Sequence, residues 1–211
     1  MPSLEALLVF TAAAMVLNIS PGPSNLYVMA RSISQGPSAG MLAAAGLAIG
    51  SLVHVAGAAL GLSVLFRTSA LAYEILKYAG AAYLIWLGIQ AWRDSGRPLD
   101  VVRAGLPKAP GTILRESLLV EALNPKTALF FLAFLPQFAD PAAGPLIPQI
   151  LVLGLIVTVT AIPCDMLVAF ASGKVAGALQ RTPWIKRLQD RVSGSILIAL
   201  GLLVATSERT R

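Results

Sequence analysis

Asn18-Ile19-Ser20-Pro21-Gly22-Pro23 interrupts the apolar stretch Leu4–Ala30, and Asn124-Pro125-Lys126 interrupts a second apolar stretch, Thr112–Phe138. Proline lacks a backbone N–H and clashes with the preceding helical turn, and glycine frees the backbone further, so neither segment continues a regular helix. Both interruptions fall about halfway along their stretch, and Asn18 and Asn124 are half the chain apart. The sequence therefore predicts two broken helices in equivalent places.

The composition identifies the solvent of these helices as lipid. The 211 residues are 56% hydrophobic and only 12% charged, and the mean hydropathy is +0.77. Soluble proteins carry about 25% charged residues, which excludes a soluble globular domain and a disordered chain. The single cysteine, Cys164, excludes a disulfide scaffold.

Six apolar stretches are long enough to consider as membrane spans. They are Leu4–Ala30, Gly40–Phe66, Ala72–Trp92, Thr112–Phe138, Ile147–Ser172 and Val192–Ala205. A span needs about 20 apolar residues, so we expect six transmembrane helices, with five as the alternative because the last stretch is short.

The linker-like segment 93–111 separates residues 1–92 from residues 112–211. Three spans in each half make the second half enter the membrane from the opposite side. The expected fold is therefore an all-α integral membrane protein of two inverted three-helix repeats, in which the first and fourth helices are broken.

The net charge of +6 is interpreted as an orientation signal. If the spans alternate, eleven of the 16 cations fall on one side of the membrane. The positive-inside rule then places loops 93–115 and 173–191 in the cytoplasm and both termini outside. These loops lack aromatic interleaving, so we expect contacts with membrane lipid and no nucleic-acid partner.

The two breaks indicate a binding site, because irregular backbone at membrane depth is tolerated only against protein or a water-filled cavity. Free carbonyls at one half-helix end suit an ammonium group, and free N–H groups at the other suit a carboxylate. An amino acid carries both groups. The candidate substrate-binding residues are Asn18, Ser20, Pro21, Gly22, Pro23, Ser24, Asn124, Pro125, Lys126 and Asp165. The alternative is a pair of kinks that only improve packing.

Ionisable side chains inside spans are costly and usually functional. Lys126 is a candidate for binding a carboxylate, and Asp165, beside a proline break at Pro163, for binding an ammonium group or a proton. Glu121 and His54 are further candidates for proton coupling. The alternatives are an internal ion pair between Lys126 and these carboxylates, and a histidine that only bonds a neighbouring helix.

Other functions have less support in the sequence. One histidine, one cysteine and scattered carboxylates supply neither a nucleophile with its base nor a metal cluster, so we expect no catalytic residues, no cofactor and no bound metal. An integral-membrane enzyme is therefore a weak alternative. Cys164 beside Asp165 leaves a metal-cation efflux protein as another. Small-residue spacings such as Gly57-x-x-x-Gly61 favour helix packing within the chain, with a homodimer as the alternative.

The chain resembles the LysE/RhtB family of bacterial amino-acid exporters along nearly its whole length. The resemblance rests on Asn18 to Pro23, Tyr83-Leu84-Ile85-Trp86-Leu87-Gly88, Leu123-Asn124-Pro125-Lys126-Thr127-Ala128, Phe130-Phe131, Leu135-Pro136-Gln137-Phe138 and the final Gly194-to-Gly201 helix. It implies a bacterial inner-membrane carrier, often dimeric, that expels amino acids or derivatives such as homoserine lactone by proton antiport. The family's motif residues correspond to Asn18, Pro21, Gly22, Pro23, Asn124, Pro125 and Lys126.

Overall fold

The computed structural model describes residues 2–20, 22–68, 70–95, 107–181 and 183–206, and these residues contain helices and no strand. The α-helices are α1 Leu4–Ile19, α2 Pro23–Gln35, α3 Pro37–Thr68, α4 Ala70–Arg93, α5 Pro110–Ala122, α6 Pro125–Leu129, α7 Leu146–Arg181 and α8 Pro183–Thr206. Three short helical segments connect α6 to α7: the π-helical η1 Phe130–Phe134 and the 3-10 helices η2 Leu135–Phe138 and η3 Pro141–Ala143.

Both predicted helix breaks are confirmed. α1 and α2 meet at a bend of 50°, which passes through Pro21, outside the described residues. α5 ends at Ala122 and α6 begins at Pro125. In each break a proline starts the second half-helix, where its missing N–H leaves no intrahelical bond unmade.

Fewer helices of the described residues qualify as membrane spans by length and hydropathy than the predicted six or five. Among the described residues, three helical segments are long and apolar enough to cross a membrane, and a fourth is added if the bent α1–α2 pair is one span. The three are Pro37–Gly61, Pro110–Phe138 and Leu146–Ser172. Glu74 and Lys77 lower the hydropathy of α4, and charged residues fill the first turns of α8. The six-span arrangement therefore stays a prediction.

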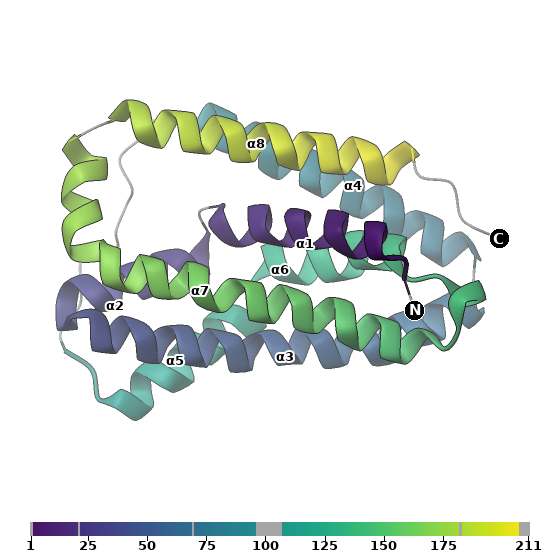
Figure 1. Ribbon diagram of the computed structural model, residues 1–211, viewed down its shortest axis with the longest axis horizontal. Coiled ribbons are helices and arrows are strands. Elements are labelled where there is room, and N and C mark those ends of the chain that lie inside the picture. The colour runs from purple at the N-terminus through teal and green to yellow at the C-terminus, as the bar shows by residue number, and fades with distance from the viewer. Residues whose placement is uncertain (1, 21, 69, 96–106, 182, 207–211) are drawn as a thin grey trace.

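The helices form an elongated bundle in which α3 lies along α7 and α4 along α8 (Figure 1). One end of the bundle holds the α2–α3 turn, the end of α4, the start of α5 and the α7–α8 connection. The other end holds the start of α1, the end of α8, the start of α4 and η3. The described ends of the basic loops therefore lie together at one end of the molecule.

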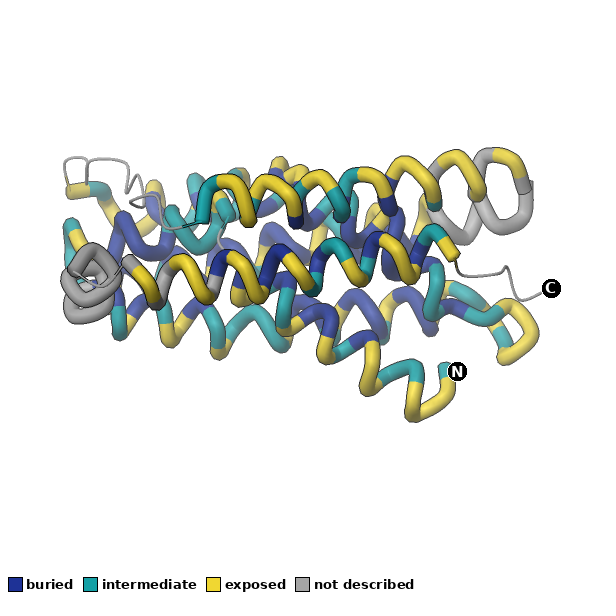
Figure 2. Tube along the Cα trace, turned by 90° about the horizontal axis from the view of Figure 1, so that it is seen from above, coloured by how far each residue is buried: buried dark blue, intermediate teal, exposed yellow. Residues whose placement is uncertain are grey.

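The surface of the bundle is apolar and its interior contains polar groups. Exposed residues line the outer sides of the helices (Figure 2), and they include Leu60, Leu167 and Phe170, each at least 59% exposed. Charged and polar side chains such as Glu121, Lys126 and Asp165 are buried inside. This distribution suits a protein whose outer surface is solvated by lipid.

Small residues bring the helices into close contact, as the sequence indicated. A Cβ atom on Gly88 would lie 2.5 Å from the carbonyl oxygen of Gly194, and one on Gly194 would lie 2.6 Å from that of Gly88. The α4–α8 contact is thus reciprocal. Gly50 packs equally closely against the α5 backbone, whereas Gly57 and Gly61 have open space around them.

Candidate functional site

The two breaks meet at one cavity, together with α3 and α7. Its polar lining is Asn18, Ser24, Asn25, Ser51, Glu121, Asn124, Lys126, Thr127 and Asp165. Leu17, Leu47, Ala48, Val157 and Ala161 complete the wall. The predicted convergence of the two breaks is therefore present in the structure.

Lys126 links one break to the other. Its ammonium donates to the carbonyl oxygen of Ser20 across 2.5 Å, and the Lys126 side chain is only 9% exposed. Ser20 follows the last residue of α1 as its C-cap, so its carbonyl lies outside the hydrogen-bond ladder of the helix and is free to accept. Gly22 makes room for this contact, because a Cβ atom there would lie 3.3 Å from Cδ of Lys126.

Glu121 is held by groups from both breaks. The hydroxyl of Ser24, in the first turn of α2, donates to its carboxylate, and Asn124 Nδ2 donates to the same oxygen at 3.2 Å. Asn124 Nδ2 also lies 2.9 Å from Ser24 Oγ, and Asn124 Oδ1 caps α6 by accepting from the N–H of Lys126 at 3.1 Å. Glu121 is therefore a fixed member of a polar network.

Asp165 differs from Glu121 in having no partner. It is 7% exposed and lines the cavity, yet its carboxylate makes no hydrogen bond or ion pair with the described residues. The expected break beside it is wrong, because α7 continues through Pro163. The proline ring removes one backbone hydrogen bond, and the flanking turns keep the helix intact.

No ion pair joins Lys126 to Glu121 or Asp165 within the described chain. The internal ion pair considered as an alternative is thus not formed in this structure. Both carboxylates still act electrostatically on the lysine across the cavity. The lining of the cavity thus includes one cation and two acids that form no ion pair with one another.

The remaining predicted residues have structural contacts. Asn18 Nδ2 donates to the carbonyl oxygen of Val157 and to Thr160 Oγ1 on α7, at 3.2 and 3.1 Å. His54 Nε2 lies 2.8 Å from the carbonyl oxygen of Glu121, so it bonds a neighbouring helix and does not line the cavity. Pro23 and Pro125 begin their helices without lining it either.

Three polar residues of the lining, Asn25, Ser51 and Thr127, were not predicted. Asn25 and Thr127 each stand next to a predicted residue in the sequence, and Asn25 Nδ2 donates to the carbonyl oxygen of Asn18 at 3.1 Å. Ser51 Oγ bonds Thr158 Oγ1 at 2.8 Å. Ser51 stands about one helical turn before His54 in an apolar stretch, and this second polar residue was the signal that could have identified it as part of the site.

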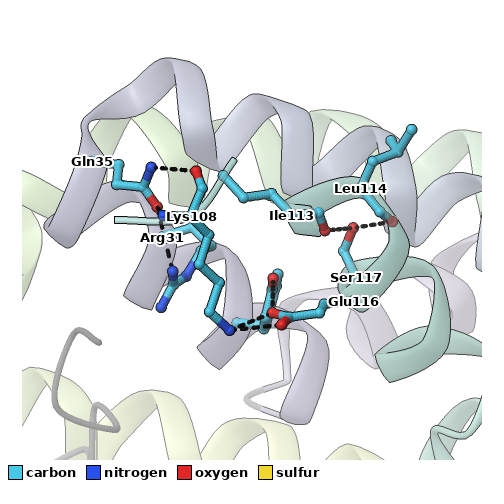
Figure 3. Close-up of polar contacts among 8 residues, drawn as sticks. Arg31, Gln35, Lys108, Ile113, Leu114, Glu116 and Ser117 are labelled. Atoms are coloured by element: carbon cyan, nitrogen blue, oxygen red, sulfur yellow. Dashed lines mark hydrogen bonds and ion pairs between the residues drawn. The ribbon is translucent and has the colours of Figure 1, made fainter. Parts of the chain in front are cut away.

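A polar clamp joins α2 to α5 at the basic end of the bundle (Figure 3). Gln35 exchanges two 2.9 Å hydrogen bonds with the backbone of Lys108, whose ammonium reaches Glu116 at 2.6 and 2.8 Å. Tyr27 also donates to Glu116, at 2.8 Å. The clamp fixes the outer ends of the two half-helices whose inner ends form the cavity.

No group of three or more histidine, cysteine or acidic residues gathers in the part of the chain that the structure describes. Cys164 is half-buried and does not line the cavity. Charged groups at the centre of a lipid-solvated helical bundle, between two broken helices, are typical of a membrane transport protein.

The chain belongs to the LysE type translocator family, whose sequence model matches residues 15–208. A homoserine/homoserine lactone efflux protein of Salmonella typhimurium is 36% identical over 91% of this chain and 92% of its own. A leucine efflux protein of an Enterobacter species is 34% identical over 64% of each chain. An uncharacterized membrane protein of Vibrio cholerae is 34% identical over 95% of this chain and 97% of its own. No solved structure matches the chain significantly.

Proposed function

We propose that the protein is a secondary transporter that exports amino acids or amino-acid derivatives across the bacterial inner membrane by proton antiport. The family assignment and the relatives named as homoserine, homoserine lactone and leucine efflux proteins support the substrate class. The observation that carries the mechanism is the buried carboxylate of Asp165, which has no hydrogen-bond partner among the described residues and lines a cavity that also holds Lys126.

The charges of the cavity suit the two ends of an amino acid. The ammonium of Lys126 has three N–H donors and uses one on Ser20, so a substrate carboxylate can take the others. Asp165 accepts from no donor of the described residues, so we assign it to binding the substrate ammonium. Glu121 is already bonded by Ser24 and Asn124, so we assign it to holding the two breaks together.

The charge balance supports coupling to protons. With one cation and two carboxylates the cavity carries one surplus negative charge, which is expensive in an apolar bundle. A proton on Asp165 removes this surplus, whereas an amino acid adds no net charge, and its ammonium can bind the Asp165 carboxylate only after that proton has left. The two cations therefore compete for one carboxylate, and this competition is the basis of antiport. His54 is a weaker candidate for a proton carrier, because its Nε2 already forms a hydrogen bond with the backbone carbonyl of Glu121.

The proposed fold is the six-helix inverted repeat, with halves 1–92 and 112–211 joined by the basic linker 93–111. Two contacts support it, Ser20 with Lys126 and Gly88 with Gly194, because each joins residues 106 positions apart. Asn18 and Asn124 have the same spacing. A residue touches its own symmetry equivalent only near a two-fold axis, so both contacts mark where that axis would pass.

We further propose that the basic end of the bundle, with loops 93–115 and 173–191, faces the cytoplasm, and that both termini face outward. The open space around Gly57 and Gly61 leaves a homodimer as a possible assembly.

The test is transport by the purified protein in liposomes. Labelled homoserine and leucine should exchange across the membrane, and an imposed pH gradient should drive their accumulation. The proposal fails if neither amino acid shows counterflow under any pH gradient, and if cells that express Asn124→Ala or Asp165→Asn resist toxic amino-acid analogues as well as wild type does.

A further inference from the structure

A second cavity lies on the other side of Lys126. It is bounded by α4 and α8 and is lined by Ser20, Gln90, Ala91, Asp94, Lys126 and Asp190. Among the residues that the structure describes, Lys126 alone lines both this second cavity and the central one. The hydrogen bond from Lys126 to Ser20 therefore stands at the boundary between the two.

The second cavity repeats the charge pattern of the central one. Each contains the same lysine ammonium and two carboxylates, Glu121 and Asp165 in the first and Asp94 and Asp190 in the second. Asp190 is only 5% exposed, and a buried carboxylate in an apolar helical bundle is costly. Asp94 and Asp190 also have interactions within the protein. The two cavities are therefore alike in the charges of their lining residues, and this likeness does not require either aspartate to be free.

Lys126 has unused hydrogen-bonding capacity at this boundary. It is nine-tenths buried, it has three N–H donors, and the carbonyl of Ser20 is its single acceptor among the described residues. A buried donor without an acceptor is costly unless a ligand or water supplies one. A carboxylate on either side of Lys126 would supply it.

We propose that the second cavity is a second amino-acid subsite, in which Lys126 binds the substrate carboxylate and Asp94 and Asp190 attract the substrate ammonium. The inference rests on the proposed function and adds a stage to it. The substrate keeps its carboxylate at Lys126 while its ammonium moves from the Asp94 and Asp190 side to Asp165. Since Asp94 follows α4 at the basic end of the bundle, this subsite is the earlier of the two in export.

The test is protection of an introduced cysteine by substrate. Cys164→Ser provides a cysteine-free background, and Ala91→Cys and Gln90→Cys are reporters in the second cavity. Trp184→Cys, at the exposed start of α8 and outside the cavity lining, is the control. The probe is whichever of homoserine and leucine exchanges faster. At about ten times its Kd the probe should slow maleimide modification of both reporters about tenfold and leave the control unchanged.

Variants separate the two subsites. Protection should persist with Asp165→Asn, and it should be lost with Asp94→Asn or Asp190→Asn, or when the N-acetyl derivative of the probe replaces it. Unprotected reporters in a protein that still exchanges the probe would overturn the second subsite and leave the transport function intact. Loss of protection in Asp165→Asn would overturn it too, because the central cavity would then be the sole site. Absence of exchange would instead reject the transport function.

Discussion

The ammonium of Lys126 donates to the carbonyl oxygen of Ser20, so the start of α6 is bonded directly to the end of α1. This bond exists because the first break leaves the Ser20 carbonyl outside any helix. It also places the cation at the boundary of two cavities. The consequences of moving this side chain, or of removing its neighbours, can be measured.

Gly22→Ala should weaken substrate binding without unfolding the protein. The backbone of Gly22 is extended, at φ −165°, which any residue adopts, so the added methyl acts only through its contact with Lys126 at 3.3 to 3.4 Å. We expect a raised KM for exchange and a change in stability below about 1 kcal/mol. Gly57→Ala, with open space around it, is the matched control. An unchanged KM would contradict the role given to Lys126.

Asp165→Asn should uncouple transport from the proton gradient. The amide cannot exchange a proton, so a pH gradient should no longer drive accumulation, while exchange of substrate for substrate continues. Loss of a charged hydrogen bond of about 1.5 to 3 kcal/mol should raise KM by roughly tenfold or more. Asp140→Asn, which changes an acid that caps η3 far from the cavity, should leave both properties unchanged. Gradient-driven uptake by Asp165→Asn would rule out Asp165 as the carrier.

Asn124→Ala should destabilise the fold more than Asn25→Ala. Asn124 caps α6 and bonds Ser24 and Glu121, whereas Asn25 donates one bond, to Asn18. A lost cap costs about 1 kcal/mol and each lost bond a similar amount, so we expect about 2 to 3 kcal/mol for Asn124 and about 1 for Asn25. Thermal unfolding in detergent measures both. Equal effects would show that the Asn124 network contributes little.

Gly88→Ala and Gly194→Ala should destabilise the protein to the same extent. Each added methyl would lie 2.5 to 2.6 Å from the carbonyl oxygen of the other glycine, and overpacking of this kind costs about 1 to 3 kcal/mol. Similar effects are expected because each methyl meets the other glycine's carbonyl and one further side chain, Ile198 Cγ1 at 2.6 Å for Gly88 and Trp92 Cδ1 at 2.5 Å for Gly194. A large effect at one glycine and none at the other would argue against equivalent halves. Gly61→Ala, in open space, serves as the neutral comparison.

Glu116→Gln should have a small effect on stability although its contacts are short. The ion pair between Lys108 and Glu116 is about one-third exposed on each side, and such pairs contribute about 0.2 to 1 kcal/mol. A double-mutant cycle with Lys108→Gln isolates that contribution. A coupling well above this range would mean that the clamp between α2 and α5 is a major determinant of the fold.

The breaks could be predicted from the sequence because proline and glycine act on their own backbone. That Asn18, Asn124, Lys126 and Asp165 line one cavity could be expected too, since polar residues stand out in apolar stretches, whereas their roles in binding stay predictions. The break at Pro163 was expected and is absent, because one proline removes a single hydrogen bond and α7 tolerates it. Such a balance depends on the packing of neighbouring turns, which a local pattern does not report.

The different states of Glu121 and Asp165 could not be predicted. Both are acids inside apolar segments. Glu121 accepts from Asn124 and from Ser24, which is 97 residues away in the chain, whereas Asp165 has no such donor among the described residues. The second cavity was also hidden, because it brings α4 and α8 against the two breaks. The residues of both cavities come from several helices, and no single stretch of the sequence shows which helices pack against one another.

The charged groups of the central cavity, Glu121, Lys126 and Asp165, all belong to the second half of the chain, while the first half supplies only neutral groups such as Asn18, Ser24 and Ser51. The second half of the chain therefore supplies the charged groups of the cavity, and the first half supplies neutral residues of its wall. If the halves exchange conformations during transport, the inward-open and outward-open states will not be mirror images. The charges will travel with the second half in both directions, and the first half will act as the frame against which they move.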